Sequence, residues 1–173
     1  MSGKKDNGNS LLLFCILVFI LQLILSNYVH FGPYVHICLL PLLIALMPFN
    51  WRPSSTLLVS FALGLLLDLL SDGVIGLNAG AAVCCAAPKK YLYHLTTNSD
   101  RQDRSASVSR KRIGNAKYFT FLAVCAAVFT LAYVLLDCMD LQNWGLIPVR
   151  FLASATINFI LSSILSISFL RKN

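Results

Sequence analysis

Two aspartates lie in a strongly apolar part of the sequence and are the first candidates for chemistry. Asp68 interrupts the apolar run 57–80, and Asp72 follows four residues later, about one turn of a helix. An ionisable side chain at bilayer depth costs about 2.5–3.5 kcal/mol even on permissive insertion scales, so it usually has a partner or a function. Two such carboxylates could accept hydrogen bonds, form ion pairs, or act as general acid and base.

The rest of the composition gives the acid–base alternative little support. Glutamate is absent, and the three histidines are scattered along the chain. No nucleophile–base arrangement and no pair of metal-binding motifs accompanies the aspartates. Most cysteines fall inside apolar segments, where cysteine behaves as a small hydrophobic residue. We therefore expect a protein that is not an enzyme and that binds no metal or other cofactor.

The composition also indicates the class of protein. Hydrophobic residues make up 57% of the 173 residues and charged residues only 12%, which cannot cover the surface of a soluble domain. We expect an all-α integral membrane protein, a six-helix transmembrane bundle that follows a short tail, 1–10, and forms a single domain, 11–173. The predicted spans are about 11–26, 34–49, 55–70, 74–93, 118–136 and 146–170.

The fourth span is the least regular of the six. Only residues 74–87 precede Pro88, whereas roughly 20 residues are needed to cross the hydrocarbon core. Extending the span to residue 93 requires Lys89 and Lys90 to snorkel toward the interface. A re-entrant segment is the alternative.

Basic residues support the six-span arrangement, because Lys and Arg accumulate in the cytoplasmic loops of membrane proteins. Eight of the 14 lie in 89–117, and only Arg150 falls on the opposite side of the membrane in this arrangement. We therefore expect both termini to be cytoplasmic and 94–117 to be a flexible basic loop. The positive charge would attract anionic lipid headgroups. Nucleic acid is not an expected partner, because no basic patch is interleaved with aromatic residues in a folded domain.

Helical spacing predicts how the third and fourth spans meet. Gly64 and Asp68 are four residues apart and therefore share one face of the third span. In the fourth span Gly76 and Gly80 form a GxxxG pair, which permits close approach of a neighbouring helix. Asn78 lies between them and could hydrogen-bond across this hairpin or cap exposed backbone. Simple packing is our interpretation of the glycines.

The sixth span carries a second polar series at intervals of four residues. Its members are Arg150, Ser154, Asn158, Ser162 and Ser166. Four-residue steps rotate by about 40° on a helix of 3.6 residues per turn, so all five cannot face one neighbour. Arg150 and the two aspartates fall in the same outer half of the membrane. We hypothesise that Arg150 pairs with Asp68 or Asp72; snorkelling of Arg150 alone to the interface is the alternative.

The segment 57–79, LLVSFALGLLLDLLSDGVIGLNA, resembles the hallmark segment of the rod shape-determining protein MreD family. That family shows a phenylalanine, a Gly-Leu pair, an aspartate and then Gly-Leu-His or Gly-Leu-Asn at this spacing. The matching residues here are Phe61, Gly64, Leu65, Asp68, Gly76, Leu77 and Asn78. Family members are bacterial inner-membrane proteins of about this length with five or six spans and no soluble domain, which is consistent with the whole chain.

The resemblance implies a non-catalytic scaffold subunit of the cell-elongation (rod) complex in the bacterial cytoplasmic membrane. The implied partner is MreC, with the MreB cytoskeleton, the RodA glycosyltransferase and a class B penicillin-binding protein reached indirectly. The family's fold is similar to that of the S components of energy-coupling-factor vitamin transporters. A small-ligand-binding subunit of such a transporter is therefore the alternative function. The candidate contacts for a partner or ligand are Gly64, Asp68, Asp72, Gly76, Asn78, Arg150 and Asn158.

Overall fold

The computed structural model describes residues 3–28, 36–49, 51–71, 74–97, 115–138 and 147–172. Seven helices occupy these ranges: α1 (Gly3–Tyr28), α2 (Leu40–Leu46), α3 (Pro53–Leu70), α4 (Leu77–Ala86), α5 (Lys89–Thr97), α7 (Asn115–Cys138) and α8 (Ile147–Lys172). By length and composition α3, α7 and α8 could each cross a membrane, and α1 and α4 contain shorter apolar stretches. The predicted all-helical class is confirmed, and the three long apolar helices are compatible with a membrane protein.

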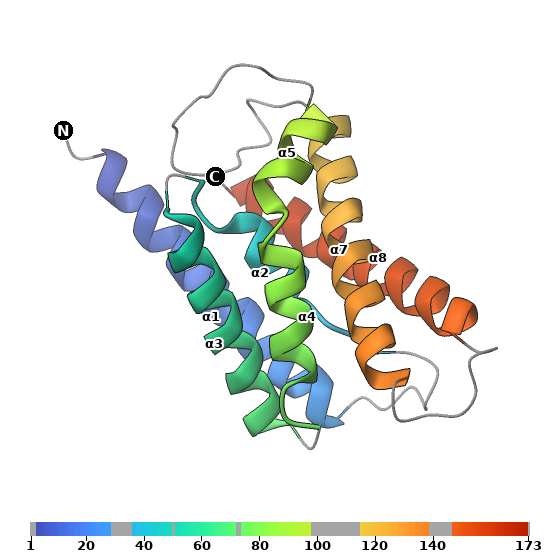
Figure 1. Ribbon diagram of the computed structural model, residues 1–173. Helices are drawn as coiled ribbons and strands as arrows, with labels where there is room; N and C mark the ends of the chain where they lie inside the picture. The colour runs from blue at the N-terminus through green and yellow to red at the C-terminus, as the bar shows by residue number, and fades with distance from the viewer. Residues whose placement is uncertain are drawn as a thin grey trace.

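The helices run mainly between two ends of the molecule, with α2 in the middle (Figure 1). α4 packs against α3 on one side and α7 on the other, and α8 packs against α7. The beginning of α1, the end of α8 and the whole of α5 lie toward the same end (Figure 1). α1 begins inside the predicted tail 1–10, and the middle of the predicted basic loop, 98–114, lies outside the described residues.

The predicted fourth span is divided into two helices. α4 ends at Ala86 and α5 begins at Lys89, with Pro88 between them. Proline lacks a backbone donor and clashes with the carbonyl of the preceding turn, so it kinks or breaks a helix. Turn-like hydrogen bonding continues beyond the break, because the Leu92 N–H donates to the Pro88 carbonyl at 2.8 Å. As a result α5 leaves α4 in a different direction (Figure 1).

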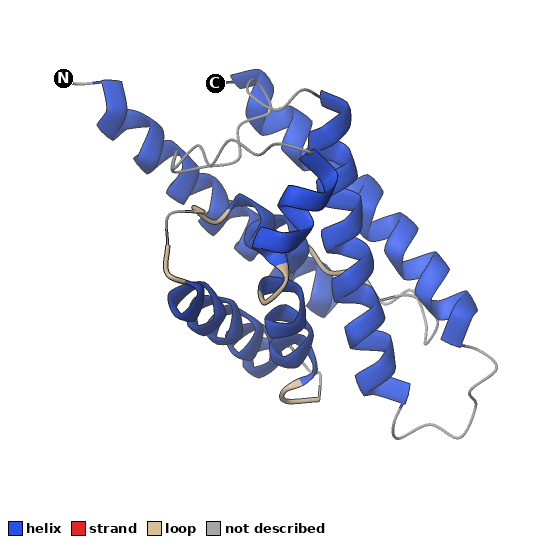
Figure 2. Ribbon diagram, turned by 45° about the horizontal axis from the view of Figure 1, so that its top comes forward, coloured by secondary structure: helices blue, strands red, loops and turns tan. Residues whose placement is uncertain are grey.

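The predicted second span, 34–49, is not a continuous helix. Residues 36–39 are non-helical, and α2 has only seven residues. Two prolines explain its length. Pro41 occupies the first turn, where its missing N–H costs nothing, and opposes extension of the helix backward. Pro48 follows Met47, whose ψ of 143° is the extended conformation favoured before proline. The loop that leads into α2 passes among the helices (Figure 2).

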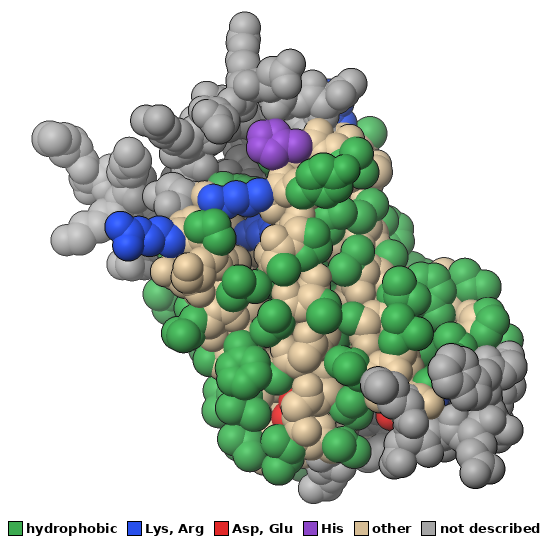
Figure 3. Space-filling model, in the orientation of Figure 1, with side chains coloured by type: hydrophobic (Ala, Val, Ile, Leu, Met, Phe, Trp, Pro, Cys, Tyr) green, Lys and Arg blue, Asp and Glu red, His purple; other side chains and the backbone are tan. Residues whose placement is uncertain are grey.

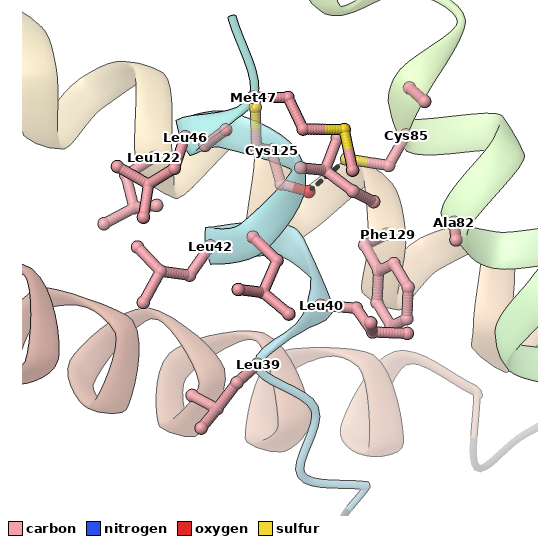
Figure 4. Packing of buried hydrophobic residues seen from close by; sticks show 14 of the residues in the cluster. Leu39, Leu40, Leu42, Leu46, Met47, Ala82, Cys85, Leu122, Cys125 and Phe129 are labelled. Carbon is pink, nitrogen blue, oxygen red and sulfur yellow. Dashed lines mark hydrogen bonds between the residues drawn. The ribbon is translucent and has the colours of Figure 1, made fainter. Parts of the chain in front are cut away.

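α2 is the centre of the hydrophobic core, and all of its residues are buried. Figure 4 shows side chains of α2 and the residues around it among those of α4 and α7. The residues labelled there are Leu39, Leu40, Leu42, Leu46, Met47, Ala82, Cys85, Leu122, Cys125 and Phe129. Lipid tails are as apolar as these side chains, so in a membrane close packing holds such a core rather than exclusion of water. Many apolar side chains also cover the outer surface (Figure 3), as lipid contact requires.

α3 and α4 approach each other closely at Gly64, which has the shortest contacts to another helix of the described glycines. A Cβ at Gly64 would lie 2.5 Å from Ala79 Cα and 2.7 Å from the Asn78 carbonyl oxygen, so no larger residue fits without movement of the backbone. α3 and α4 therefore approach closely, but the glycine that permits this is Gly64 of α3 and not the GxxxG pair of the fourth span. The two glycines of the GxxxG pair have other roles: Gly76 adopts a φ of +101° before α4, and Gly80 faces Leu136 of α7.

We predict that Gly64→Ala destabilises the protein, because its added Cβ meets backbone atoms of α4 that cannot rotate away. Overpacking of this kind costs about 1–3 kcal/mol. Gly80→Ala is the matched control, since its Cβ would meet only the Cδ1 atom of Leu136, the end of a side chain, at 2.9 Å. Thermal unfolding in mild detergent should give a clearly lower midpoint for Gly64→Ala than for Gly80→Ala. Equal midpoints would contradict this packing.

Candidate functional site

Asp68 caps the N-terminus of α4 from the neighbouring helix. The first N–H groups of a helix have no partner within it, and α4 has no side-chain cap of its own. Asp68 Oδ2 accepts hydrogen bonds from the N–H groups of Gly76 at 2.9 Å and Ala79 at 3.2 Å, and Oδ1 accepts one from the Asn78 N–H at 3.2 Å. The side chain is 2% exposed. A carboxylate in this position also interacts favourably with the helix dipole.

The backbone before α4 is shaped to meet this cap. Gly76 adopts a left-handed φ of +101°, which side chains of L-residues disfavour. In this conformation its N–H reaches Asp68, while its carbonyl accepts the N–H of Gly80 at 2.8 Å within the first turn. Asp72, the other predicted carboxylate, lies outside the described residues, and its role stays a prediction.

Asn78 links this cap to the segment that precedes α2. Its Nδ2 donates to Asp68 Oδ1 at 2.9 Å, a hydrogen bond across the hairpin that is one of the two roles considered for Asn78. Its Oδ1 lies 3.2 Å from His36 Nε2, and because a carbonyl oxygen only accepts, this bond requires a proton on Nε2. The His36 ring stacks on Tyr133 of α7, with ring centroids 3.6 Å apart. A chain of contacts thus runs from α3 through Asn78 and His36 to α7.

The non-helical residues before α2 take their hydrogen-bond partners from α8. Asn158 Oδ1 accepts from the Cys38 N–H at 2.8 Å, and Asn158 Nδ2 donates to the His36 carbonyl at 3.2 Å. Ser154 Oγ accepts from the His36 N–H at 3.0 Å. Non-helical backbone at membrane depth is tolerated only where such partners satisfy it inside the protein. Asn158 was predicted as a contact residue, and in the structure its contacts are with this backbone and with Thr130.

Gln22 of α1 completes this set from the other side. Its Oε1 accepts from the Leu39 N–H at 2.8 Å, and its Nε2 donates to the Ile37 carbonyl at 3.1 Å. Gln22 was not among the predicted site residues, although a polar amide within the first apolar run is the same kind of signal that identified Asp68. The structure shows Gln22 to be fully buried. His36 was also passed over, because its partner Asn78 is 42 residues away in sequence.

Lys89 satisfies the opposite end of α2. Its ammonium donates to the carbonyl of Met47 at 2.6 Å and lies 4.6 Å from the centre of the Phe49 ring. A cation next to the C-terminal end of a helix is favoured by the helix dipole, and the ring face adds a cation–π contact. Snorkelling of this lysine to the interface was the wrong expectation: Lys89 is 3% exposed and turned inward. Its neighbour Lys90 is exposed.

Arg150 pairs with Asp137 of α7, with 2.6 Å between Nη2 and Oδ2. The hypothesis that it pairs with Asp68 is wrong. Asp68 is already engaged by four donors at the start of α4, whereas Asp137 lies in the last turn of α7, beside the first turn of α8. Both partners of this ion pair are partly exposed, so it contributes only about 0–1 kcal/mol.

The polar series along α8 faces different neighbours, as the rotation of four-residue steps predicts. Ser154 and Asn158 hold residues 36–38, whereas Ser166 Oγ lies 2.7 Å from the hydroxyl of Tyr118 in α7. Ser162 is fully buried, and its Oγ has no hydrogen-bond partner among the described residues. The series therefore packs α8 against two parts of the protein.

The described polar groups of this site are directed at backbone atoms and at one another. Within the described ranges, no three His, Cys, Asp or Glu side chains are arranged to hold a metal ion. Both carboxylate oxygens of Asp68 accept hydrogen bonds from the protein's own groups. What this arrangement can do is fix the α3–α4 hairpin and the segment before α2 in one geometry.

Comparisons with known proteins give no independent guide to the site. The chain matches no family model, no curated protein and no solved structure. A functional conclusion therefore depends on the geometry of the site and on the residues of the segment 57–79.

We predict that Asp68→Asn lowers stability, because an amide would replace one acceptor oxygen with a donor that faces the N–H groups of α4. Loss of buried hydrogen bonds of this kind costs about 1–3 kcal/mol. Asp137→Asn is the matched control, since it makes the same change in a partly exposed ion pair. Thermal unfolding in mild detergent should show a larger loss for Asp68→Asn. A loss no greater than that of Asp137→Asn would refute the capping role.

We predict that Asn158→Leu loosens the segment before α2, because it leaves the Cys38 N–H and the His36 carbonyl buried without partners. Each unsatisfied group costs about 1–3 kcal/mol. Ser162→Ala, one turn away on α8 and equally buried, removes a hydroxyl that has no partner in the described part of the chain. Hydrogen exchange followed by mass spectrometry should accelerate at residues 36–39 in Asn158→Leu and remain unchanged in Ser162→Ala. Equal exchange in both variants would remove Asn158 from this role.

Proposed function

We propose that this protein is a non-catalytic membrane scaffold subunit of the bacterial cell-elongation complex. In this proposal it binds MreC in the cytoplasmic membrane and supports lateral peptidoglycan synthesis and cell shape. MreB, RodA and a class B penicillin-binding protein are reached indirectly, through the complex. This identification rests on the resemblance of the segment 57–79 to the MreD family.

The observation that carries the proposal is the way the hallmark residues meet. Gly64 lets the two helices touch, Gly76 provides the turn, Asp68 caps α4, and Asn78 continues the network to His36. The spacing that defines the segment therefore joins α3 and α4 by close packing and by several hydrogen bonds. Such joining suits a protein whose role is to present contacts to partners, because less order has to be gained on binding.

Phe61 is a large hallmark side chain that takes no part in this network. It is 47% exposed on the outer face of α3, together with Leu58 and Leu69. A transmembrane helix of a partner could pack on this face, since lipid and helix surfaces compete there on the basis of packing. We therefore assign the MreC contact to the outer face of α3.

The membrane arrangement in this proposal has six crossings with both ends of the chain in the cytoplasm. The second crossing consists of residues 36–39 followed by α2, and the fourth consists of α4 and reaches the cytoplasmic interface at α5. The placement of the beginning of α1 and the end of α8 toward one end of the molecule supports it (Figure 1). Membrane lipids cover the remaining apolar surface.

We predict that the protein, purified from its native membrane in mild detergent, carries MreC with it. Mass spectrometry of the co-purifying proteins and small molecules is the measurement. Phe61→Ala should reduce the recovery of MreC, because it removes a large side chain from the proposed contact. Ile160→Ala is the matched control, because Ile160 is similarly exposed, at 54%, on α8.

Two results would contradict this proposal. Recovery of a vitamin-sized molecule or a transporter ATPase module, without MreC, would favour the transporter-subunit alternative. In that case the ligand should stabilise the protein in proportion to the logarithm of its concentration above Kd. Equal recovery of MreC with both variants would move its contact away from α3.

A further inference from the structure

α5 presents one face to the core and a different face outward. Leu92 is buried, and the ring of Tyr93 lies 4.6 Å from that of Phe49 and 5.7 Å from that of Phe121, measured between ring centroids. These contacts fix the orientation of the helix. Packing of Leu92 and Tyr93 against the core therefore determines which side chains of α5 point outward.

The outward face of α5 consists of two adjacent stripes. Lys90 and His94 are four residues apart and exposed, and Tyr91 and Leu95 form a parallel pair that is 68% and 65% exposed. Basic residues next to exposed apolar residues are typical of helices that lie in the headgroup region of a membrane. α5 directly follows the break at Pro88, which turns it away from α4.

A second exposed pair lies just before α3. Trp51 is partly exposed and Arg52 is exposed at the start of that helix. Figure 3 shows Lys, Arg and His side chains gathered toward the end of the molecule where α5 lies, above a body covered by apolar side chains. Tryptophan and tyrosine are enriched at membrane–water interfaces, where one part of the ring is apolar and the other polar.

Neither Arg52 nor Lys90 is neutralised by an acidic side chain in the described part of the protein. The ion pair found there joins Arg150 to Asp137, and no described side chain accepts a hydrogen bond from Arg52 or Lys90. Lys89 differs from its neighbour, because its ammonium is bonded to the carbonyl of Met47. Two exposed cations flanked by two interfacial aromatic residues thus lack an anionic partner within the described chain.

We propose that Trp51, Arg52, Lys90 and Tyr91 bind the headgroups of anionic phospholipids in the adjacent leaflet. The two cations contact lipid phosphates, and the aromatic rings lie at the boundary between headgroups and acyl chains. This inference rests on the membrane location given above, but it does not depend on MreC. Its test uses purified protein, so its failure is distinguishable from failure of the proposed function.

The first experiment measures binding of phosphatidylglycerol and phosphatidylcholine to the detergent-purified full chain by native mass spectrometry. Arg52→Gln and Lys90→Gln should each weaken phosphatidylglycerol binding by about fivefold, the effect of one basic residue near an anionic surface, and leave phosphatidylcholine binding unchanged. Arg52→Lys should retain binding. Arg150→Gln is the control, because it removes one positive charge from a partly buried ion pair with Asp137. Unchanged phosphatidylglycerol binding in Arg52→Gln and Lys90→Gln would overturn the proposal.

A second measurement does not depend on these variants. Trp144→Phe leaves Trp51 as the only tryptophan of the chain. In vesicles of phosphatidylcholine with a minor fraction of brominated lipid, brominated phosphatidylglycerol should quench Trp51 fluorescence more strongly than brominated phosphatidylcholine, and added salt should reduce the difference. Equal quenching by the two lipids would contradict an anionic lipid site. Binding of an acidic protein without any preference for phosphatidylglycerol would also contradict it.

Discussion

Backbone groups that leave a helix inside a membrane must find hydrogen-bond partners within the protein, because hydrocarbon offers none. Residues 36–39 leave the helical conformation among the packed helices, and the start of α4 also has backbone groups without partners in its own helix. Asn158 and Gln22 satisfy the first, and Asp68 satisfies the second. α1, α3 and α8 are therefore tied to the centre of the molecule by polar side chains, while α2 and α7 contribute most of the apolar packing around them.

A charged side chain from another helix caps one end of each of two short helices, α4 and α2. The carboxylate of Asp68 lies at the N-terminus of α4, and the ammonium of Lys89 lies beside the carbonyl that follows α2. These signs match the helix dipole, which is positive at the N-terminus and negative at the C-terminus. In each case the charge comes from a different helix than the one it caps. The caps therefore join helices to one another as well as completing them.

The buried polar side chains bond within the protein, whereas the outer surfaces are free for contact with other molecules. Asp68, Asn78 and Asn158 form hydrogen bonds with the protein's own atoms and so stabilise the fold. Among the described residues, exposed apolar side chains cover the outer faces of α1, α3 and α8, and exposed basic and aromatic side chains lie at the end formed with α5. The proposed helix of a partner protein and the proposed lipid headgroups would therefore contact different parts of the molecule.

Composition and local spacing predicted the helical class, and they singled out Asp68 and Asn78 as polar residues inside apolar segments. Each depends on residues close in sequence, where helical periodicity decides which side chains share a face. The partner of Arg150, the inward turn of Lys89 and the roles of Gln22 and His36 depended on the tertiary structure. They join residues 13 to 42 positions apart, as in Arg150 with Asp137 and His36 with Asn78. Periodicity reports the face of a helix, but only packing decides which neighbour that face meets.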